Sequence, residues 1–226
     1  MADYQLGRSL AWDIGIYEVA ATLSGLLDAP LLSTNYSRLV IDCNRPPESP
    51  ESVPEVSEGV VIPGNTKIDD RDRMARQSEV FWPYHQAITD VLDSRAQRGL
   101  KTALVSLHSF NPMRGGCFRP WDIGVTYLNA NPLSSHLLAT FDRSEGGLLV
   151  GDNQPYAVTR DSDFVVPRHG QDRGLDSVLV EIRQDLLVHE RDRRRWVEDL
   201  RTSLIRYLHD RATEHDNTST KEIGKW

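Results

Sequence analysis

The stretch TALVSLHSFNP, residues 102–112, is the strongest indicator of the fold in this sequence. Its first six residues are almost continuously apolar, which is typical of a strand that is covered on both faces. His108 and Ser109 follow directly. We therefore expect a buried strand over residues 102–107 with a histidine at its carboxyl end.

Strands and helices alternate on both sides of this segment. Apolar and β-branched runs predict short strands at residues 31–32, 38–42, 59–62, 122–128, 148–150 and 177–183. Apolar spacing, charge and breaking residues predict helices over residues 13–27, 69–98, 132–145 and 192–211. This alternation indicates an α/β fold, a three-layer α/β/α sandwich with a central mixed, mostly parallel sheet.

Breaking residues mark the limits of the predicted elements. Residues 44–65 contain five prolines and predict a long loop. Pro83 is expected to kink or divide the second helix, and Gly99 to end it. The polar composition from Thr213 onward predicts a flexible tail. We expect a single domain over residues 1–212 and a tail over residues 213–226.

Composition limits the class of protein. The chain has 226 residues, 39% of them hydrophobic and 26% charged, with a net charge of −7. It has no run of 18 apolar residues, and its first residues lack the basic and apolar regions of a signal peptide. Cys43 and Cys117 form no Cys-x-x-Cys pair. We expect a cytoplasmic protein that binds neither membranes nor nucleic acid; composition says nothing of its oligomeric state.

Three polar clusters lie at the carboxyl ends of predicted strands, at residues 42–45, 108–109 and 181–185. In open α/β sheets, ligands bind outside the carboxyl ends of the strands. We therefore expect the three clusters to share one site. Taken by itself, a histidine placed like His108 is more often a hydrogen-bonded loop residue than a functional one.

Glu181 interrupts an otherwise apolar strand. A carboxylate buried in this way needs a partner or a metal ion. An ion pair with Arg183 is one structural alternative, and Arg45 or Arg38 would serve equally well. The position therefore suggests either catalysis or a buried ion pair.

The segment Asp42-Cys43-Asn44-Arg45 has the donors that an acidic ligand requires. A guanidinium offers two parallel donors to a carboxylate, and an amide beside it adds a third. Asn44 and Arg45, held by Asp42, are thus candidates to bind the acidic end of a substrate. The alternative is that they anchor the loop that follows.

Together these segments resemble the N-formylglutamate amidohydrolases. Residues 36–47, YSRLVIDCNRPP, look like the arginine-bearing strand and loop of that family, and residues 11–15, AWDIG, like its first helix. Further segments recur in the same order, namely Ile62–Asn65, Pro83–His85, Ser106–Phe110, Arg119–Trp121, Gly151–Tyr156 and Glu181–Asp185. The resemblance covers about residues 10–190.

The resemblance implies a fold like that of the zinc carboxypeptidases and hydrolysis of an N-acyl amide, typically N-formyl-L-glutamate, to formate and glutamate in histidine degradation. It implies that His108 is a zinc ligand and Glu181 the general base. Asn44 and Arg45, with Arg38 as a further candidate, would hold the substrate carboxylate. His169 and Arg183 are additional candidates for substrate contacts.

One part of the family pattern is missing from the sequence. The family takes further zinc ligands from a segment before its first helix, whereas the first histidine here is His85. Catalytic zinc normally has three protein ligands, and packing is the more common role for a histidine placed like His85. We expect one Zn²⁺ site whose remaining ligands lie upstream of Met1.

Two alternatives stay open at this stage. The chain could be a catalytically inactive relative that binds acidic ligands through Asn44 and Arg45 without metal. It could also be a structural or partner-binding protein, although only the polar tail and the charged run Glu190–Arg195 support that interpretation, and such runs are usually solvated helix faces.

Overall fold

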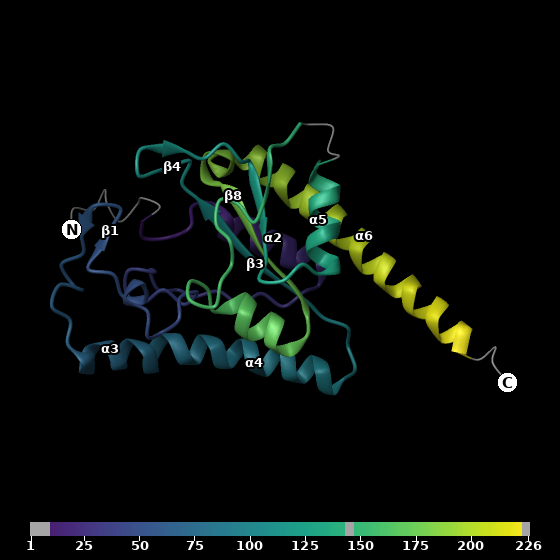
Figure 1. Ribbon diagram of the computed structural model, residues 1–226, viewed down its shortest axis with the longest axis horizontal. Helices are drawn as coiled ribbons and strands as arrows, with labels where there is room; N and C mark the ends of the chain where they lie inside the picture. The colour runs from purple at the N-terminus through teal and green to yellow at the C-terminus, as the bar shows by residue number, and fades with distance from the viewer. Residues whose placement is uncertain (1–9, 143–146, 223–226) are drawn as a thin grey trace.

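A mixed sheet forms the centre of the molecule in the computed structural model, which describes residues 10–142 and 147–222, the last nine as backbone alone. Within these residues the sheet has four strands, ordered β3 (Ala103–Phe110), β8 (Asp176–Arg183), β6 (Ile123–Thr126) and β7 (Val150–Asp152). Two pairings, β3–β8 and β6–β7, are parallel, and β6–β8 is antiparallel. The expected mixed, mostly parallel sheet is confirmed, and β3 forms one of its edges (Figure 1).

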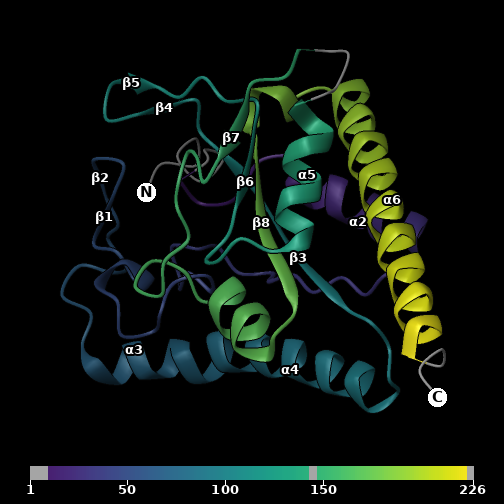
Figure 2. The same cartoon turned by 45° about the vertical axis from the view of Figure 1, so that its right-hand side comes forward.

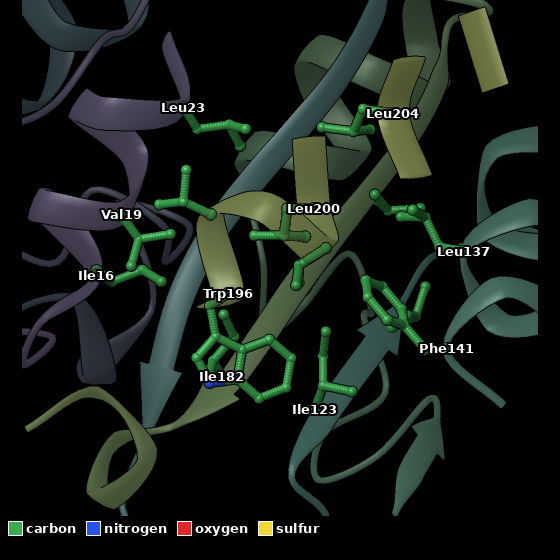
Figure 3. Packing of buried hydrophobic residues seen from close by; sticks show 14 of the residues in the cluster. Ile16, Val19, Leu23, Ile123, Leu137, Phe141, Ile182, Trp196, Leu200 and Leu204 are labelled. Carbon is green, nitrogen blue, oxygen red and sulfur yellow. The ribbon is translucent and has the colours of Figure 1, made fainter. Parts of the chain in front are cut away.

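Three helices cover one face of this sheet, α2 (Ile16–Leu27), α5 (Pro132–Asp142) and α6 (Glu190–Glu222) (Figure 2). Their apolar sides pack on the sheet around side chains such as Val19, Leu137, Ile182 and Leu200 (Figure 3). Val180 belongs to the same core. Because side chains alternate along a strand, the intervening residues of β8 face the other side of the sheet.

The opposite face is covered by less regular chain. The π-helical turn η3 (Val166–Gly170) packs on Leu179 through Val166 and leads into η4 (Gln171–Arg173). A long helical run lies beyond it, made of α3 (Asp70–Arg76), η2 (Gln77–Phe81) and α4 (Trp82–Gln97) (Figure 2). Helices therefore flank the sheet on both sides. The likeness to zinc carboxypeptidases stays a prediction.

Pro83 changes the type of helix rather than separating two helices. It lies in the first turn of α4, directly after the π-helical segment η2. There the backbone N–H of Trp82 donates to the carbonyl of Gln77, five residues earlier. The wider turn accommodates a residue that has no N–H of its own. As expected, Gly99 follows the end of α4 with a positive φ of 65°.

The strands predicted at residues 31–32 and 38–42 are wrong. Neither segment is part of a sheet, and the second forms a turn in which the Val40 N–H donates to the Ser37 carbonyl. Ile41 and Cys43 are nevertheless buried, in a cluster with Phe81. The β-branched residues that suggested a strand are thus explained by burial in a loop.

Other boundaries differ by a few residues. β3 is longer than expected and contains His108, and as an edge strand it is half-buried over residues 103–108 rather than buried as we predicted. The 44–65 loop contains the turn η1 (Pro50–Ser52) and the hairpin of β1 (Val56–Ser57) and β2 (Val60–Val61). Further short elements that we did not predict are β4 (Met113–Arg114), β5 (Cys117–Phe118) and η5 (Gln184–Leu187).

The C-terminal helix is also longer than expected. α6 continues through residues 213–222, where we expected a tail, and the flexibility of that segment stays a prediction. Residues 143–145, the predicted end of α5, and residues 223–226 lie outside the described residues. None of the described helices combines the length and the apolar character needed to cross a membrane.

Candidate active site

His108 and Glu181 lie side by side on the two parallel strands β3 and β8. The strand register pairs their Cα positions. Both side chains face away from the helical core, since Val180 and Ile182 of β8 point into it. The sheet therefore brings together the two residues that we expected to be catalytic or metal-binding.

Asp13 is the third member of this group, and it was not among the predicted site residues. Its Oδ2 lies 2.6 Å from Nδ1 of His108. We expected Asp13 to begin the first helix, but α2 starts at Ile16, and Ser109 Oγ donates to the carbonyl of Ile14 at 3.0 Å. The turn before α2 thus fixes Asp13 against β3. Its place in the family-like segment AWDIG, just before a helix, is the signal that could have identified Asp13 from the sequence.

Burial and charge interactions together shift the pKa values of all three residues. Burial alone would lower the pKa of His108, but the charge and hydrogen bond of Asp13 raise it to about 9. Burial would raise the pKa of Asp13, but His108 and then Arg38 bring it below its ordinary value. Burial raises the pKa of Glu181 to about 7 against the opposing effect of His108. Near neutral pH the site holds a cationic imidazole beside a carboxyl group that titrates.

We expect Asp13→Asn to lower the pKa of His108 by about one unit or more, because the charge that offsets burial is removed. An NMR titration of the His108 imidazole measures this shift directly. Asp161→Asn, at an exposed position, is the matched control and should leave the titration in place. An unchanged His108 pKa in Asp13→Asn would show that Asp13 does not control its protonation.

Asp42 lies between Arg38 and Arg45, two of the three arginines that were expected to bind substrate. Arg38 pairs with Asp42 at 2.5 Å and lies 3.6 Å from Asp13. Nε of Arg45 lies 3.8 Å from Asp42 and 3.8 Å from Glu51, and its guanidinium donates to the Ser162 carbonyl. Both arginines are partly exposed and line the same cavity, which has a volume of about 1020 Å³. Each guanidinium therefore borders the cavity, and part of its positive charge is already paired with the carboxylate of Asp42.

The amide of Asn44 is engaged with another loop. Its Nδ2 donates to Asp163 at 3.0 Å, and its Oδ1 accepts from the backbone N–H of Val165 at 3.1 Å. The Asn44 carbonyl accepts from the N–H of Phe164. This is the loop-anchoring geometry that we considered as the alternative for this segment. A substrate contact of Asn44, which stays a prediction, would compete with these bonds.

His169 lies in the interior and not in the cavity lining. Its Nε2 is 2.9 Å from Nδ1 of His85, whose Nε2 is 2.9 Å from the Cys43 carbonyl. Because a carbonyl only accepts, His85 carries its proton on Nε2, and His169 donates to His85. Among the described residues, Nδ1 of His169 has no partner. The pair therefore supports the loop that carries Arg45, and a direct substrate contact of His169 stays a prediction.

This histidine pair predicts a loss of stability in acid. Burial, reinforced by neighbouring charge, lowers the pKa of His85 to about 3 and that of His169 to about 4. Below about pH 6.5 the unfolded chain binds protons that the folded chain does not. The free energy of unfolding should fall by about 1 kcal/mol per pH unit for each histidine between about pH 6.5 and 4.

Urea unfolding at a series of pH values tests this. His169→Gln should have a shallower slope, whereas His209→Gln, at an exposed position on α6, should keep the slope of the unmodified chain. Identical slopes in all three proteins would contradict the assignment.

Arg183 lies outside the cavity lining as well. It pairs with Asp122 at 3.1 Å and Asp185 at 2.8 Å, and donates to the carbonyl of Pro120. These contacts tie the end of β8 to the segment before β6. The alternative ion pair with Glu181 does not form, and a substrate role for Arg183 stays a prediction.

The cavity that Arg38 and Arg45 line also reaches the group formed by Asp13, His108 and Glu181. Its lining includes Asp13, Arg38, Arg45, His108, Arg114, Tyr156 and Glu181. Oε2 of Glu181 is buried and has no hydrogen-bond partner within the described residues. An unsatisfied buried carboxylate oxygen of this kind is costly unless a ligand or water completes it.

The donors at this site do not complete the expected zinc centre. Asp13 already occupies Nδ1 of His108, which leaves Nε2 of His108 and the carboxylate of Glu181 as donors, one fewer than the usual three. Within residues 10–142 and 147–213, whose side chains the structure describes, no group of three or more His, Cys, Asp or Glu side chains could hold a metal ion. The described residues therefore do not fit a catalytic zinc ion by themselves.

Comparison with known proteins identifies the family. The chain is similar to gene product Atu2144 from Agrobacterium tumefaciens, a crystal structure with 34% identity and a TM-score of 0.88 over 93% of this chain and 82% of that one. A more remote match is N-formylglutamate amidohydrolase from Ralstonia eutropha JMP134, with 17% identity and a TM-score of 0.49 over 63% of this chain and 55% of that one. Among curated proteins, no sequence matches. The family model for N-formylglutamate amidohydrolase matches residues 2–188, and the chain belongs to that family.

Proposed function

We propose that this chain hydrolyses the amide bond of an N-acyl amino acid with an acidic side chain, and that N-formyl-L-glutamate is the first substrate to test. The observation that carries the proposal is the pairing of Glu181 with His108 at the cavity, with Asp13 behind His108. Membership of an amidohydrolase family supports the same class of reaction.

Glu181 is suited to act as the general base. A pKa of about 7 lets its carboxylate accept a proton near neutral pH and return it. In the proposed reaction Glu181 takes a proton from water as the water oxygen bonds to the amide carbon. The proton then passes to the nitrogen, the C–N bond breaks, and a carboxylic acid and an amine leave. For a formyl group the products are formate and the free amino acid.

His108 is suited to stabilise the developing negative charge. Asp13 holds Nδ1 and keeps the ring cationic, since the pKa of His108 is raised to about 9. The proton on Nε2 is then available to donate to the oxygen of the amide carbonyl as that oxygen gains charge. Asp13 is the positioning residue in this arrangement, because it acts through His108.

Arg38, Asn44 and Arg45 are the predicted substrate residues that line the cavity, and the amide of Asn44 is already bonded to Asp163 and Val165. Arg45 is the better donor for the α-carboxylate of the substrate, because its distance to Asp42 is 3.8 Å whereas Arg38 is bound at 2.5 Å. A closely paired guanidinium has less capacity for a second carboxylate. Arg38 then orients Asp42 and Asp13.

Formate release from N-formyl-L-glutamate tests the proposal. The protein is assayed as purified, after treatment with a chelator, and with added zinc, alongside calorimetric binding of the same compound. Turnover that requires zinc would mean that ligands outside the described residues complete a metal site. Binding by a folded protein without formate release under any condition would favour the inactive, ligand-binding alternative.

A further inference from the structure

The hairpin of β4 and β5 places a further arginine, Arg114, at the cavity. Met113–Arg114 pair with Cys117–Phe118, and Gly115 and Gly116 form the turn with φ angles of 57° and 80°. Two consecutive residues with positive φ are the signature of a tight hairpin turn, which glycine adopts without strain. Arg114 comes directly before this turn, is exposed, and lines the cavity.

The guanidinium of Arg114 is held differently from those of the other arginines in the cavity lining. Arg95 donates to Oγ1 of Thr102 and to the carbonyl of Lys101. Arg38 and Arg45 both lie near Asp42. Within the described residues Arg114 has no carboxylate within 4 Å, and its guanidinium instead lies 5.2 Å from the centre of the Tyr156 ring. A cation held over an aromatic ring keeps its N–H groups free for a carboxylate. Arg114 therefore offers a positive charge that the protein itself does not satisfy.

Tyr156 connects this charge to the reacting group. Its ring also lies 5.1 Å from the guanidinium of Arg119, which donates to the Tyr156 hydroxyl. The charge of Arg119 in turn lowers the pKa of Glu181. The ring of Tyr156 thus contacts both Arg114 and an arginine whose charge acts on the proposed base. A substrate whose amide lies at Glu181 would extend its side chain along this ring.

We propose that Arg114 binds the acidic side chain of the substrate and selects acidic over neutral N-acyl amino acids. This inference rests on the proposed function for its choice of ligand. Arg45 would hold the α-carboxylate and Arg114 the second carboxylate. Arg114 was not among the substrate residues that we expected from the sequence.

The test compares N-formyl-L-glutamate with N-formyl-L-glutamine, which have nearly the same shape and differ by one charge. In Arg114→Gln, KM for the glutamate compound should rise roughly ten- to one-hundred-fold, the value of a charged hydrogen-bonded contact. Its kcat and the KM for the glutamine compound should change little. Arg114→Lys should keep much of the discrimination, and Arg206→Gln, at an exposed position on α6, should behave like the unmodified chain.

Calorimetric dissociation constants for both compounds separate this inference from the proposed function. If neither compound is hydrolysed, the proposed function fails, yet a selective loss of glutamate-compound binding in Arg114→Gln still supports the role of Arg114. Equal losses for both compounds, no loss for either, or no binding to the unmodified chain would overturn it.

Discussion

Glu181→Gln is expected to reduce formate release by about 10²- to 10⁴-fold, the usual contribution of a general base. Glutamine has nearly the same size and shape, but it cannot take a proton from water at neutral pH. The binding of substrate should be largely retained, because the arginines at the cavity are unchanged. Steady-state kinetics and calorimetry on the same preparation measure the two effects separately.

Stability provides the control for this variant. The pKa of Glu181 is about 7 in the folded chain, raised by burial from 4.5. The folded state therefore binds a proton more tightly than the unfolded state, so that ionisation of Glu181 destabilises the fold as the pH rises from 4.5 to 7. A neutral glutamine avoids this cost, and Glu181→Gln should be at least as stable as the unmodified chain at pH 8.

Glu55→Gln, which removes an exposed carboxylate, is the matched variant and should keep full activity. A stable Glu181→Gln protein that retains activity within a few-fold would rule out Glu181 as the base.

Gly124→Ala is expected to destabilise the fold by about 3 kcal/mol. Gly124 lies in β6, directly opposite Glu181 in the sheet register. A Cβ atom at this position would lie 1.9 Å from the backbone oxygen of Gln154. The backbone of β6 cannot move freely, because β6 is an inner strand of the sheet. Gln154 follows two residues after the end of β7, which is itself paired with β6. Urea unfolding at pH 7 measures the loss.

Gly25→Ala is the matched control in the same assay, because it is expected to stabilise the fold rather than destabilise it. Gly25 lies inside α2, and a Cβ atom there would meet nothing within 4 Å. Alanine favours the helix by about 1 kcal/mol over glycine, so this variant should be slightly more stable. A Gly124→Ala protein as stable as Gly25→Ala would mean that the close approach of Gln154 to β6 is absent.

The sheet could be predicted from sequence because its strands bury apolar side chains on both faces. The run that became β8 is buried by helices on one side and by η3 on the other, whereas the run that became β3, at the edge of the sheet, is half-buried. A strand covered on both faces leaves a continuous hydrophobic pattern. The apolar residues at 38–42 left a similar pattern but are buried in a loop. A pattern of burial alone does not distinguish these two cases.

The candidate site was only partly predictable for a related reason. His108 and Glu181 stand out because polar residues in apolar strands are unusual. Asp13 stands 95 positions before His108, and no local periodicity relates the two. His169 and Arg183 looked available for ligands, whereas their partners, His85 and Asp122, lie 84 and 61 positions away and appear only once the chain is folded.

The register between β3 and β8 also limits which insertions and deletions the two strands can tolerate. Residues at odd and even positions of a strand face opposite sides of the sheet. A codon inserted into β3 ahead of His108 would turn the imidazole into the helical core, and a compensating codon in β8 would restore the alignment with Glu181 but leave both side chains facing the wrong layer. Length changes in this lineage should therefore accumulate in the loops, while the spacing within these two strands stays constant.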